Sequence, residues 1–430
     1  MQPGMIATIF GAFRVREIRN KVLFTFGLLA LYRLGSYIPS PGISASGLKA
    51  IQSHFGNSSI LGLLNTFSGG GLSHMAIFAM GIMPYITASI VFQMLQVVVP
   101  SLEKLAKEGE VGQQRITQYT RYLTVALAFA QGIAYVFLFK SFQNDAGVTF
   151  IHNFNIGKVL LIAISLTAGT VVVMWMGELI TQRGIGNGIS LMIFASIVSR
   201  IPGGMQSWWD NPSQVFKVMM PFIVIGVVAS VVFVQEGQRR IPIQYARRAV
   251  GQRMTSSGIT YMPLRVNMAG VIPVIFAASV MTIIPTVAQM VGHSRPGFST
   301  DLYNFFAPGG WHYVLGECIM IVLFTYFYTA ITFNPVDQAD NLRKSGGFIP
   351  GVRPGRPTAE FLDRILARLT LPGALFLAFI AALPTILVAR TGASFAFGGT
   401  SVLIVIGVAL DTMKQLEAQL QMRNYQGFLK

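Results

Sequence analysis

Few side chains in the apolar parts of this sequence could carry chemistry. Arg33 and Glu317 lie inside long apolar runs, and Glu178, His293 and Asp411 lie near the ends of such runs. Coupling of transport to protons or sodium ions usually needs carboxylates or histidines that follow one another along a path through the membrane. These five residues do not form such a series. We therefore expect no catalytic residue, no enzymatic activity and no cofactor in this chain.

The glycine-rich segment RGIGNGIS, residues 183–190, could be read as a nucleotide-binding loop. It lacks the strand-to-helix context of a dinucleotide site, so a tight turn that begins a short helix is the better interpretation. No Walker-type loop occurs either, and energy from ATP would have to come from a partner. The only cysteine, Cys318, excludes a disulfide and argues against a metal site.

Arginines gather in two long polar segments, residues 235–267 and 334–369. They include Arg239, Arg240, Arg247, Arg248 and Arg253 in the first segment, and Arg353 and Arg356 in the second. Guanidinium groups on stiff segments suit docking to carboxylates or phosphates. The arginines could serve only to orient the protein, but orientation does not require a 33-residue ordered loop. We predict a cytosolic docking partner. Direct DNA binding is not expected, because a nucleic acid would fit only on something that docks at a membrane.

The composition defines the class of protein that positions these loops. Hydrophobic residues make up 53% of the chain and charged residues only 11%, which is typical of a polytopic membrane protein. The basic start of the chain is not followed by a signal-peptide cleavage site. Ten apolar runs are visible, at 22–38, 75–99, 122–139, 159–176, 189–201, 215–234, 268–291, 313–333, 370–389 and 400–413.

The distribution of charge predicts the orientation. When the loops are sorted by alternating sides, 24 of the 32 basic residues fall on one side. By the positive-inside rule both termini are therefore cytoplasmic. The predicted fold is an all-α membrane protein with two inverted five-helix halves around a central path, residues 1–205 with spans 1–5 and residues 206–430 with spans 6–10.

The two basic loops have different sequence patterns. RRIPIQYARR and GITYMPLRV alternate apolar and polar residues, which predicts a β-hairpin within 235–267. In the second loop, the glycines and prolines of GGFIPGVRPGRPT predict irregular structure, followed by a helix from Thr358 to Leu369.

One apolar segment is too short to span. Residues 60–67 would form a helix of about 12 Å, against a hydrocarbon core of about 30 Å. Three glycines at 69–71 separate this segment from the long second run, in which Ile82 and Ile86 share one face and Pro84 weakens the helix between them. Ile189 and Ile193 repeat the spacing. From spacing alone, such isoleucines usually face lipid or a neighbouring helix.

Several longer motifs together identify a family. They are FSGGGLSHMAIFAMGIMPYITASI, QYTRYLT, GELITQRGIGNGIS, GQRRIPIQYARR, PLRVNMAGVIPVIFA, FNPVDQADNLRKSGGFIPGVRPGRPTAEFLDR and FGGTSVLIVIGVALD. In this order they resemble the bacterial SecY family, the central subunit of the protein-conducting channel, from about Lys21 to about Asp411. The resemblance implies that the substrate is an unfolded polypeptide, which leaves the channel across the membrane or sideways into lipid.

The resemblance also assigns site residues. The family's pore ring falls on six isoleucines: Ile82, Ile86, Ile189, Ile193, Ile275 and Ile404. The family's plug, a short helix in the outer funnel, falls on about Ser58 to Phe67, with Asn57, Ser58 or Ser59 as N-cap. Its residues are Ile60, Leu61, Leu63, Leu64 and Phe67, with Gly69, Gly70 and Gly71 as hinge. The lateral gate lies between spans 2 and 3 on one side and spans 7 and 8 on the other, with Ile283 on the facing stretch of span 7. Thr87 and Gln93 either form a polar latch or make ordinary hydrogen bonds between helices.

The partners are implied in the same way. The two loops resemble those that dock the SecA motor ATPase or the ribosome, and the family's important arginine falls on Arg353. SecE-like and SecG-like small membrane subunits, signal sequences, nascent polypeptides and membrane lipid complete the partners. The expected location is the bacterial plasma (inner) membrane.

Two other classes of protein remain open alternatives. A small-solute secondary transporter would also have inverted halves, but it would need a polar or charged site at mid-membrane. A scaffold or receptor would use the basic loops and have no conducting path, and it would have no reason to place six isoleucines at one level.

Overall fold

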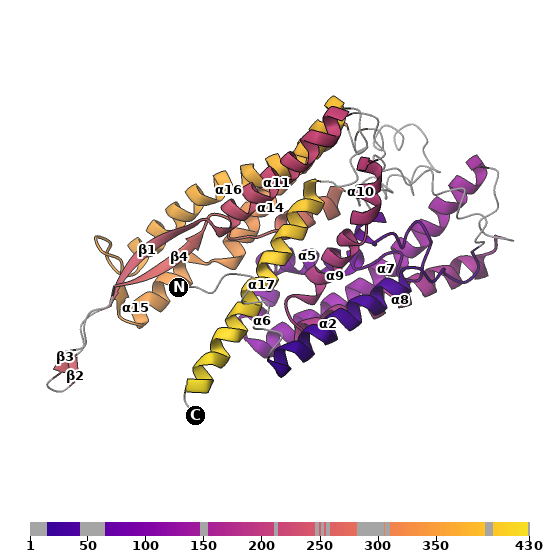
Figure 1. Cartoon of the computed structure of the whole chain (residues 1–430). Helices are drawn as coiled ribbons and strands as arrows, with labels where there is room; N and C mark the ends of the chain where they lie inside the picture. Colours follow the sequence, from indigo (N-terminus) through magenta and orange to yellow (C-terminus); the bar gives the residue numbers. More distant parts are fainter. Residues whose placement is uncertain are drawn as a thin grey trace.

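The computed structural model describes residues 15–43, 65–146, 154–209, 214–245, 249–250, 253–254, 259–281, 305, 310–391 and 399–428. Within these ranges the chain is a bundle of long helices, with a narrow β-sheet projecting from one end (Figure 1). A helix occurs in each of the ten predicted apolar runs. The predicted all-α, ten-span architecture is therefore confirmed.

The helices of the first half are α2 (Arg16–Gly35), α5 (Met83–Val98), α6 (Pro100–Lys107), α7 (Glu110–Ala146), α8 (Ile156–Arg183), α9 (Gly188–Val198) and α10 (Ile201–Trp209). The helices of the second half are α11 (Gln214–Glu236), the short apolar helix Ile272–Met281, α14 (Trp311–Thr332), α15 (Pro335–Lys344), α16 (Arg356–Thr391) and α17 (Gly399–Phe428). Among the described residues, five helical segments are long and apolar enough to cross a membrane by themselves, and α5 with α6 forms a sixth that bends by 101°. The predicted division at 205/206 falls inside α10.

The second span begins later than the sequence predicts. The run at 75–99 was expected to be helical throughout, but residues 71–82 form successive turns and α5 begins only at Met83. Gly81 has φ +54°, a conformation that ends regular structure and that glycine adopts without strain. Pro84 therefore lies in the first turn of α5, where no helical hydrogen bond is lost. The expectation that Pro84 weakens the helix between Ile82 and Ile86 is wrong.

The two basic loops form one packed body. The predicted hairpin is confirmed, since β1 (Gln238–Tyr245) pairs antiparallel with β4 (Ile259–Arg265), from Gln238 opposite Arg265 to Gln244 opposite Ile259. The short strands β2 (Ala249–Val250) and β3 (Arg253–Met254) pair at its tip. The second loop is not wholly irregular, because β5 (Gly347–Phe348) pairs with the other edge of β1. Backbone groups at that exposed edge thereby gain partners.

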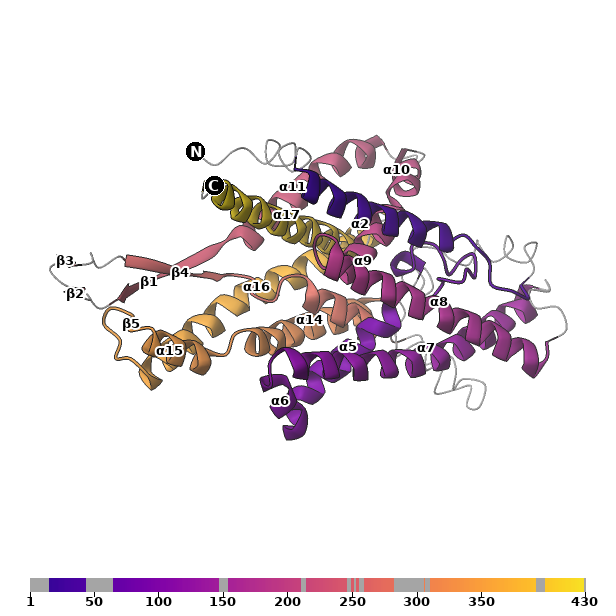
Figure 2. The same cartoon turned by 90° about the horizontal axis from the view of Figure 1, so that it is seen from below.

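An apolar core joins the sheet to the helices. Ile241, Leu264, Ile349 and Leu362 are buried together, so both loops and the start of α16 share one interior. The predicted helix from Thr358 to Leu369 continues without a break into the ninth span, and α16 is 36 residues long. Figure 2 shows this body at the same end of the bundle as the C-terminal end of α17.

Candidate pore, plug and docking residues

The six isoleucines come together in one apolar cluster at the centre of the bundle. Five of them, Ile82, Ile86, Ile193, Ile275 and Ile404, are at most 5% exposed, and Ile189 packs against them. Ile82 directly precedes α5, and the others lie on α5, α9, the helix Ile272–Met281 and α17, so both halves of the chain contribute. The alternative that these isoleucines face lipid is therefore excluded.

Glycines position the isoleucines of the first half. Asn187 caps α9, since its side-chain oxygen accepts hydrogen bonds from the Ile189 and Ser190 amides at 3.0 and 3.4 Å. A Cβ atom on Gly188 would lie 1.9 Å from the Gly177 carbonyl oxygen, so α9 packs directly on the backbone of α8. A Cβ on Gly177 would in turn touch Ile82 at 3.4 Å and Ile189 at 3.6 Å. The missing side chains leave the space into which the isoleucines pack. The predicted tight glycine turn is present, with Gly186 at φ +81°.

A second close approach positions the isoleucines of the other half. A Cβ on Gly407 would lie 2.3 Å from Cγ1 of Val271. Because this leaves no room for a side chain, α17 lies against the start of the helix Ile272–Met281, and Ile404 and Ile275 join the same cluster. Branched alkyl side chains there offer no hydrogen bond and exclude water.

The plug segment is described only at its end. Ile60, Leu61, Leu63 and Leu64 lie outside the described residues. Phe67 is 3% exposed and belongs to the same apolar cluster as the isoleucines. The three glycines that follow it form a turn, in which Gly69 and Gly70 have φ of +64° and +90°. Residues other than glycine rarely adopt this conformation, which accounts for glycine at those two positions.

The predicted gate residues bond within their own helix. The Thr87 hydroxyl donates to the Met83 carbonyl at 3.1 Å, and the Gln93 amide donates to the Ser89 hydroxyl at 3.2 Å. These are bonds along α5 and not across to another helix. Ile283 lies outside the described residues.

The docking arginines are exposed where the structure describes them. Arg239 and Arg240 lie on β1 with their side chains in solvent, and Arg353 lies in the loop before α16, where its carbonyl accepts a hydrogen bond from Thr358 at 2.8 Å. Arg356 pairs with Glu360 at 3.1 Å along α16. Arg247 and Arg248 lie outside the described residues. The loop backbone thus holds Arg353, and its guanidinium is directed to solvent.

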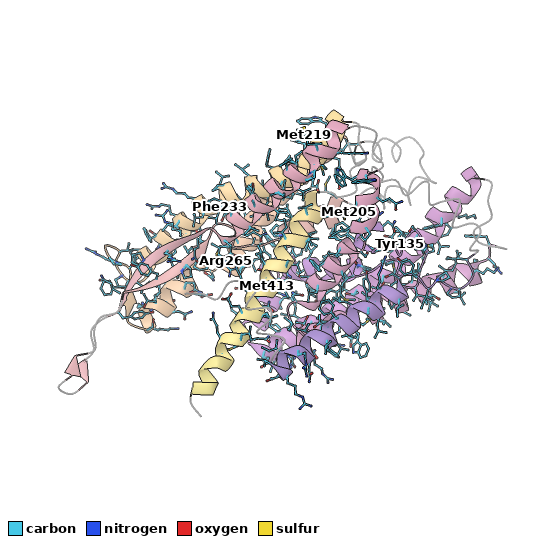
Figure 3. The ribbon with its side chains drawn as sticks, viewed as in Figure 1. Tyr135, Met205, Met219, Phe233, Arg265 and Met413 are labelled. Atoms are coloured by element: carbon cyan, nitrogen blue, oxygen red, sulfur yellow. The ribbon has the colours of Figure 1, made fainter. Side chains whose placement is uncertain are left out.

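The ionisable residues near the spans are separate from one another. Glu178 accepts two hydrogen bonds from Arg121, at 2.9 and 2.6 Å, which joins α8 to α7. Asp411 on α17 interacts with Arg265, and Figure 3 shows Arg265 beside the part of α17 that carries Met413. Glu317 is buried on α14. Across the described ranges, no group of acidic residues, histidine and cysteine could hold a metal ion.

Sequence reasoning missed a polar contact beside the plug. The Arg33 guanidinium, on α2, donates to the carbonyl of Gly69, and Arg200, just after α9, donates to the Thr66 hydroxyl at 2.5 Å. Arg33 was conspicuous as a charge in an apolar run, but nothing in the sequence indicated what it binds. Burial, and next the nearby charge of Arg33, lower the pKa of His74. At neutral pH His74 is therefore uncharged.

Comparisons with known proteins give the family. The SecY family model matches residues 76–413. The protein translocase subunit SecY of Streptomyces griseus is 47% identical over 439 residues, which cover 99% of this chain and 100% of that protein. The chain belongs to the SecY family.

Two solved structures share the fold. One is a SecY structure whose plug domain stabilises the closed state of the translocation channel and maintains a membrane seal. It is 19% identical to this chain, and the match has a TM-score of 0.59 and covers 93% of this chain and 91% of that chain. The other is Sec61 in the canine ribosome–channel complex, at 18% identity, with the same TM-score and the same coverage.

The burial of the isoleucines can be tested by truncation. Ile193→Ala removes a side chain that is 1% exposed and should lower the free energy of unfolding by about 2–4 kcal/mol. Ile225→Ala is the matched control, because Ile225 on α11 is 66% exposed and its truncation should cost about 0.5 kcal/mol or less. The measurement is unfolding in mixed micelles as the denaturing detergent increases. Equal losses for the two variants would contradict the cluster.

Proposed function

We propose that this chain forms the channel through which a protein translocase moves unfolded polypeptides across a membrane. One observation carries the proposal: six isoleucines from both halves gather into one apolar cluster, in a chain that belongs to the SecY family. A transporter for a small solute would need polar groups at this point to bind its substrate. The side chains of the six isoleucines offer none, which suits a substrate whose side chains change as it passes.

The isoleucines act as a seal that can open. In the closed state they pack on one another and leave no path for hydrated ions. A polypeptide in extended form separates them, and alkyl groups close around it without binding any particular residue. The plug, residues 60–67, covers this seal from the outer side and leaves during transport. Because a helix this short has little stability of its own, its departure requires only the loss of its contacts with the channel.

Apolar segments leave sideways between α5 and α7 on one side and the helix Ile272–Met281 and α14 on the other. The second pair moves as a unit because Phe276 and Phe324 pack edge to face, with their ring centres 5.9 Å apart. A signal sequence that enters between the two pairs reaches lipid, and its own apolar length drives the partition.

The body formed by the two basic loops is the docking site for a partner that supplies energy. The exposed arginines Arg239, Arg240 and Arg353 support this role, and so does the likeness of the fold to Sec61, which was solved in a ribosome–channel complex. The partners are a SecA motor ATPase or the ribosome, with SecE-like and SecG-like subunits in the membrane. The protein lies in the bacterial plasma membrane with both termini in the cytoplasm, as the distribution of basic residues supports.

Reconstitution tests the function directly. Vesicles that contain this chain and a SecE-like subunit, supplied with a SecA motor and ATP, should protect a preprotein from added protease. Vesicles without this chain are the control. Protection that is equal in both would contradict the proposal.

Charge reversal tests the docking body. Arg353→Glu should abolish ATP-driven translocation and leave the protein folded and assembled, because the side chain lies in a solvated loop. Arg115→Glu is the control, since Arg115 on α7 is also exposed but lies outside both basic loops, and it should leave translocation unchanged. The measurement is protease-protected preprotein in vesicles. Normal translocation by Arg353→Glu would overturn the assignment.

Cross-linking tests the gate. In a Cys318→Ala background, cysteines at Thr87 and Ile283 should form a disulfide that blocks transport, and a reducing agent should restore it. The single-cysteine variants control for local damage. If the cross-linked channel still inserts signal sequences, the gate lies between other helices.

A further inference from the structure

The turn at the end of the plug, residues 65–71, is held by side chains of α2, of α9 and of the residues directly after α9. Arg33 on α2 donates to the Gly69 carbonyl, and Arg200 after α9 donates to the Thr66 hydroxyl at 2.5 Å. Between them, the Tyr32 and Ser196 hydroxyls share a hydrogen bond of 2.8 Å, and Tyr32 also approaches the Ser68 carbonyl at 3.5 Å. The helices α2 and α9 lie side by side (Figures 1 and 2). Arg33 and Ser196, near their C-terminal ends, both lie against Gly69 of the turn.

The turn itself is a compact unit. The Ser68 hydroxyl donates to the Asn65 carbonyl at 3.2 Å and accepts from the Leu72 amide at 3.1 Å. The side-chain oxygen of Asn65 accepts from the Ser73 amide at 3.0 Å. Asn65, Phe67 and Ser68 are all at most 4% exposed. Two of these three bonds join the turn to Leu72 and Ser73, which follow it, so residues 65–73 form one hydrogen-bonded unit.

Gly69 lets the turn approach the two helices closely. A Cβ there would lie 3.2 Å from Cα of Ser196 and 3.4 Å from a guanidinium nitrogen of Arg33. Gly70 also has a positive φ, but a Cβ on it would meet nothing within 4 Å. The two neighbouring glycines thus share a backbone requirement, and only Gly69 is needed for contact with the helices.

The chemistry of the contact favours release. Both acceptors, a carbonyl and a hydroxyl oxygen, are neutral, so neither bond is an ion pair. The two guanidinium groups also repel each other. When the turn departs, water can replace the neutral acceptor that each arginine loses. Breaking an ion pair would cost more free energy, because it would leave two charges without partners. The contact is therefore strong enough to position the plug and weak enough to be broken by an arriving substrate.

We propose that Arg33 and Arg200, with Tyr32 and Ser196, form a clasp that holds the plug in the closed channel by gripping the turn behind it. The inference rests on the proposed role of residues 60–67 as a plug. Both arginines are positioning residues, since they act on the plug and not on the translocated chain.

Single-channel recording in planar bilayers tests the clasp. Arg33→Met and Arg200→Met should each raise the frequency of brief openings of the resting channel on the order of tenfold, from the loss of one charge-assisted hydrogen bond. Arg33→Lys should restore most of the closure because it retains a donor. Arg19→Met is the matched control, since Arg19 is exposed on the same helix, and it should open no more than the wild type.

Further variants test the clasp without replacing either arginine, in case the arginine variants fold poorly. Thr66→Val removes the acceptor of Arg200 without changing a membrane helix, and should open the channel as Arg200→Met does, with no further increase in the double variant. Gly69→Ala should open the channel more often than Gly70→Ala. Both substitutions strain a backbone with positive φ, but only a Cβ at position 69 would press against Ser196 and Arg33 and push the turn away from them.

Deletion of residues 60–68 separates failure of the clasp from failure of the plug. In the deleted channel, which opens often, Arg33→Met and Arg200→Met should add nothing. An increase of the same size there would overturn the clasp, because the arginines would be acting on the helices themselves. If the deletion opens the channel and the arginine variants of the full chain do not, the clasp is wrong and the plug stands. If the deletion leaves the channel closed, both are wrong.

Discussion

An ion that enters a narrow hydrocarbon constriction loses its hydration and gains no partner, and the structure of this protein depends on that penalty. A channel for polypeptides cannot use a polar filter, because carbonyl or charged groups would bind some segments of the substrate and repel others. Aliphatic side chains meet both requirements. In the function that we propose, the isoleucines at the start of α5 and on α9, α17 and the helix Ile272–Met281 close on one another at rest and around any sequence during transport.

Close packing of helix backbones places those side chains. The close approach of Gly188 to the backbone of Gly177 sets α9 against α8. The close approach of Gly407 to the side chain of Val271 sets α17 against the helix that carries Ile275. At each point a Cβ atom would force the helices apart and displace an isoleucine. Small residues at helix contacts are the usual means of close packing in membranes, where apolar surfaces have no hydrophobic reason to associate. The apolar seal therefore depends on glycines that do not belong to it.

Much of the fold followed from sequence because the membrane restricts the choices. Apolar length, charge in the loops and alternation in RRIPIQY were enough to predict the ten spans and the hairpin between β1 and β4. Local pattern failed where a distant partner decides the structure. The strand β5 forms because β1 has a free edge beside it. The helix α5 begins late because the chain turns at Gly81, which has φ +54° and lies against the backbone of Phe67 and Ser68. The six isoleucines were assigned through resemblance, since their spacing alone favours contact with lipid or with a neighbouring helix. The contacts of Arg33 and Arg200 could not be predicted, because they depend on how α2 and α9 meet.

Conductance across a planar bilayer tests the central claim that an apolar seal and a plug close the channel together. Four resting channels are compared: the wild type, the deletion of residues 60–68, a variant with Ile82, Ile86, Ile189 and Ile193 replaced by serine, and the combination of both changes. We predict a tight wild type, intermittent openings in the deletion, a more persistent leak in the serine variant, and the largest leak in the combination. Four equally tight channels would contradict the account.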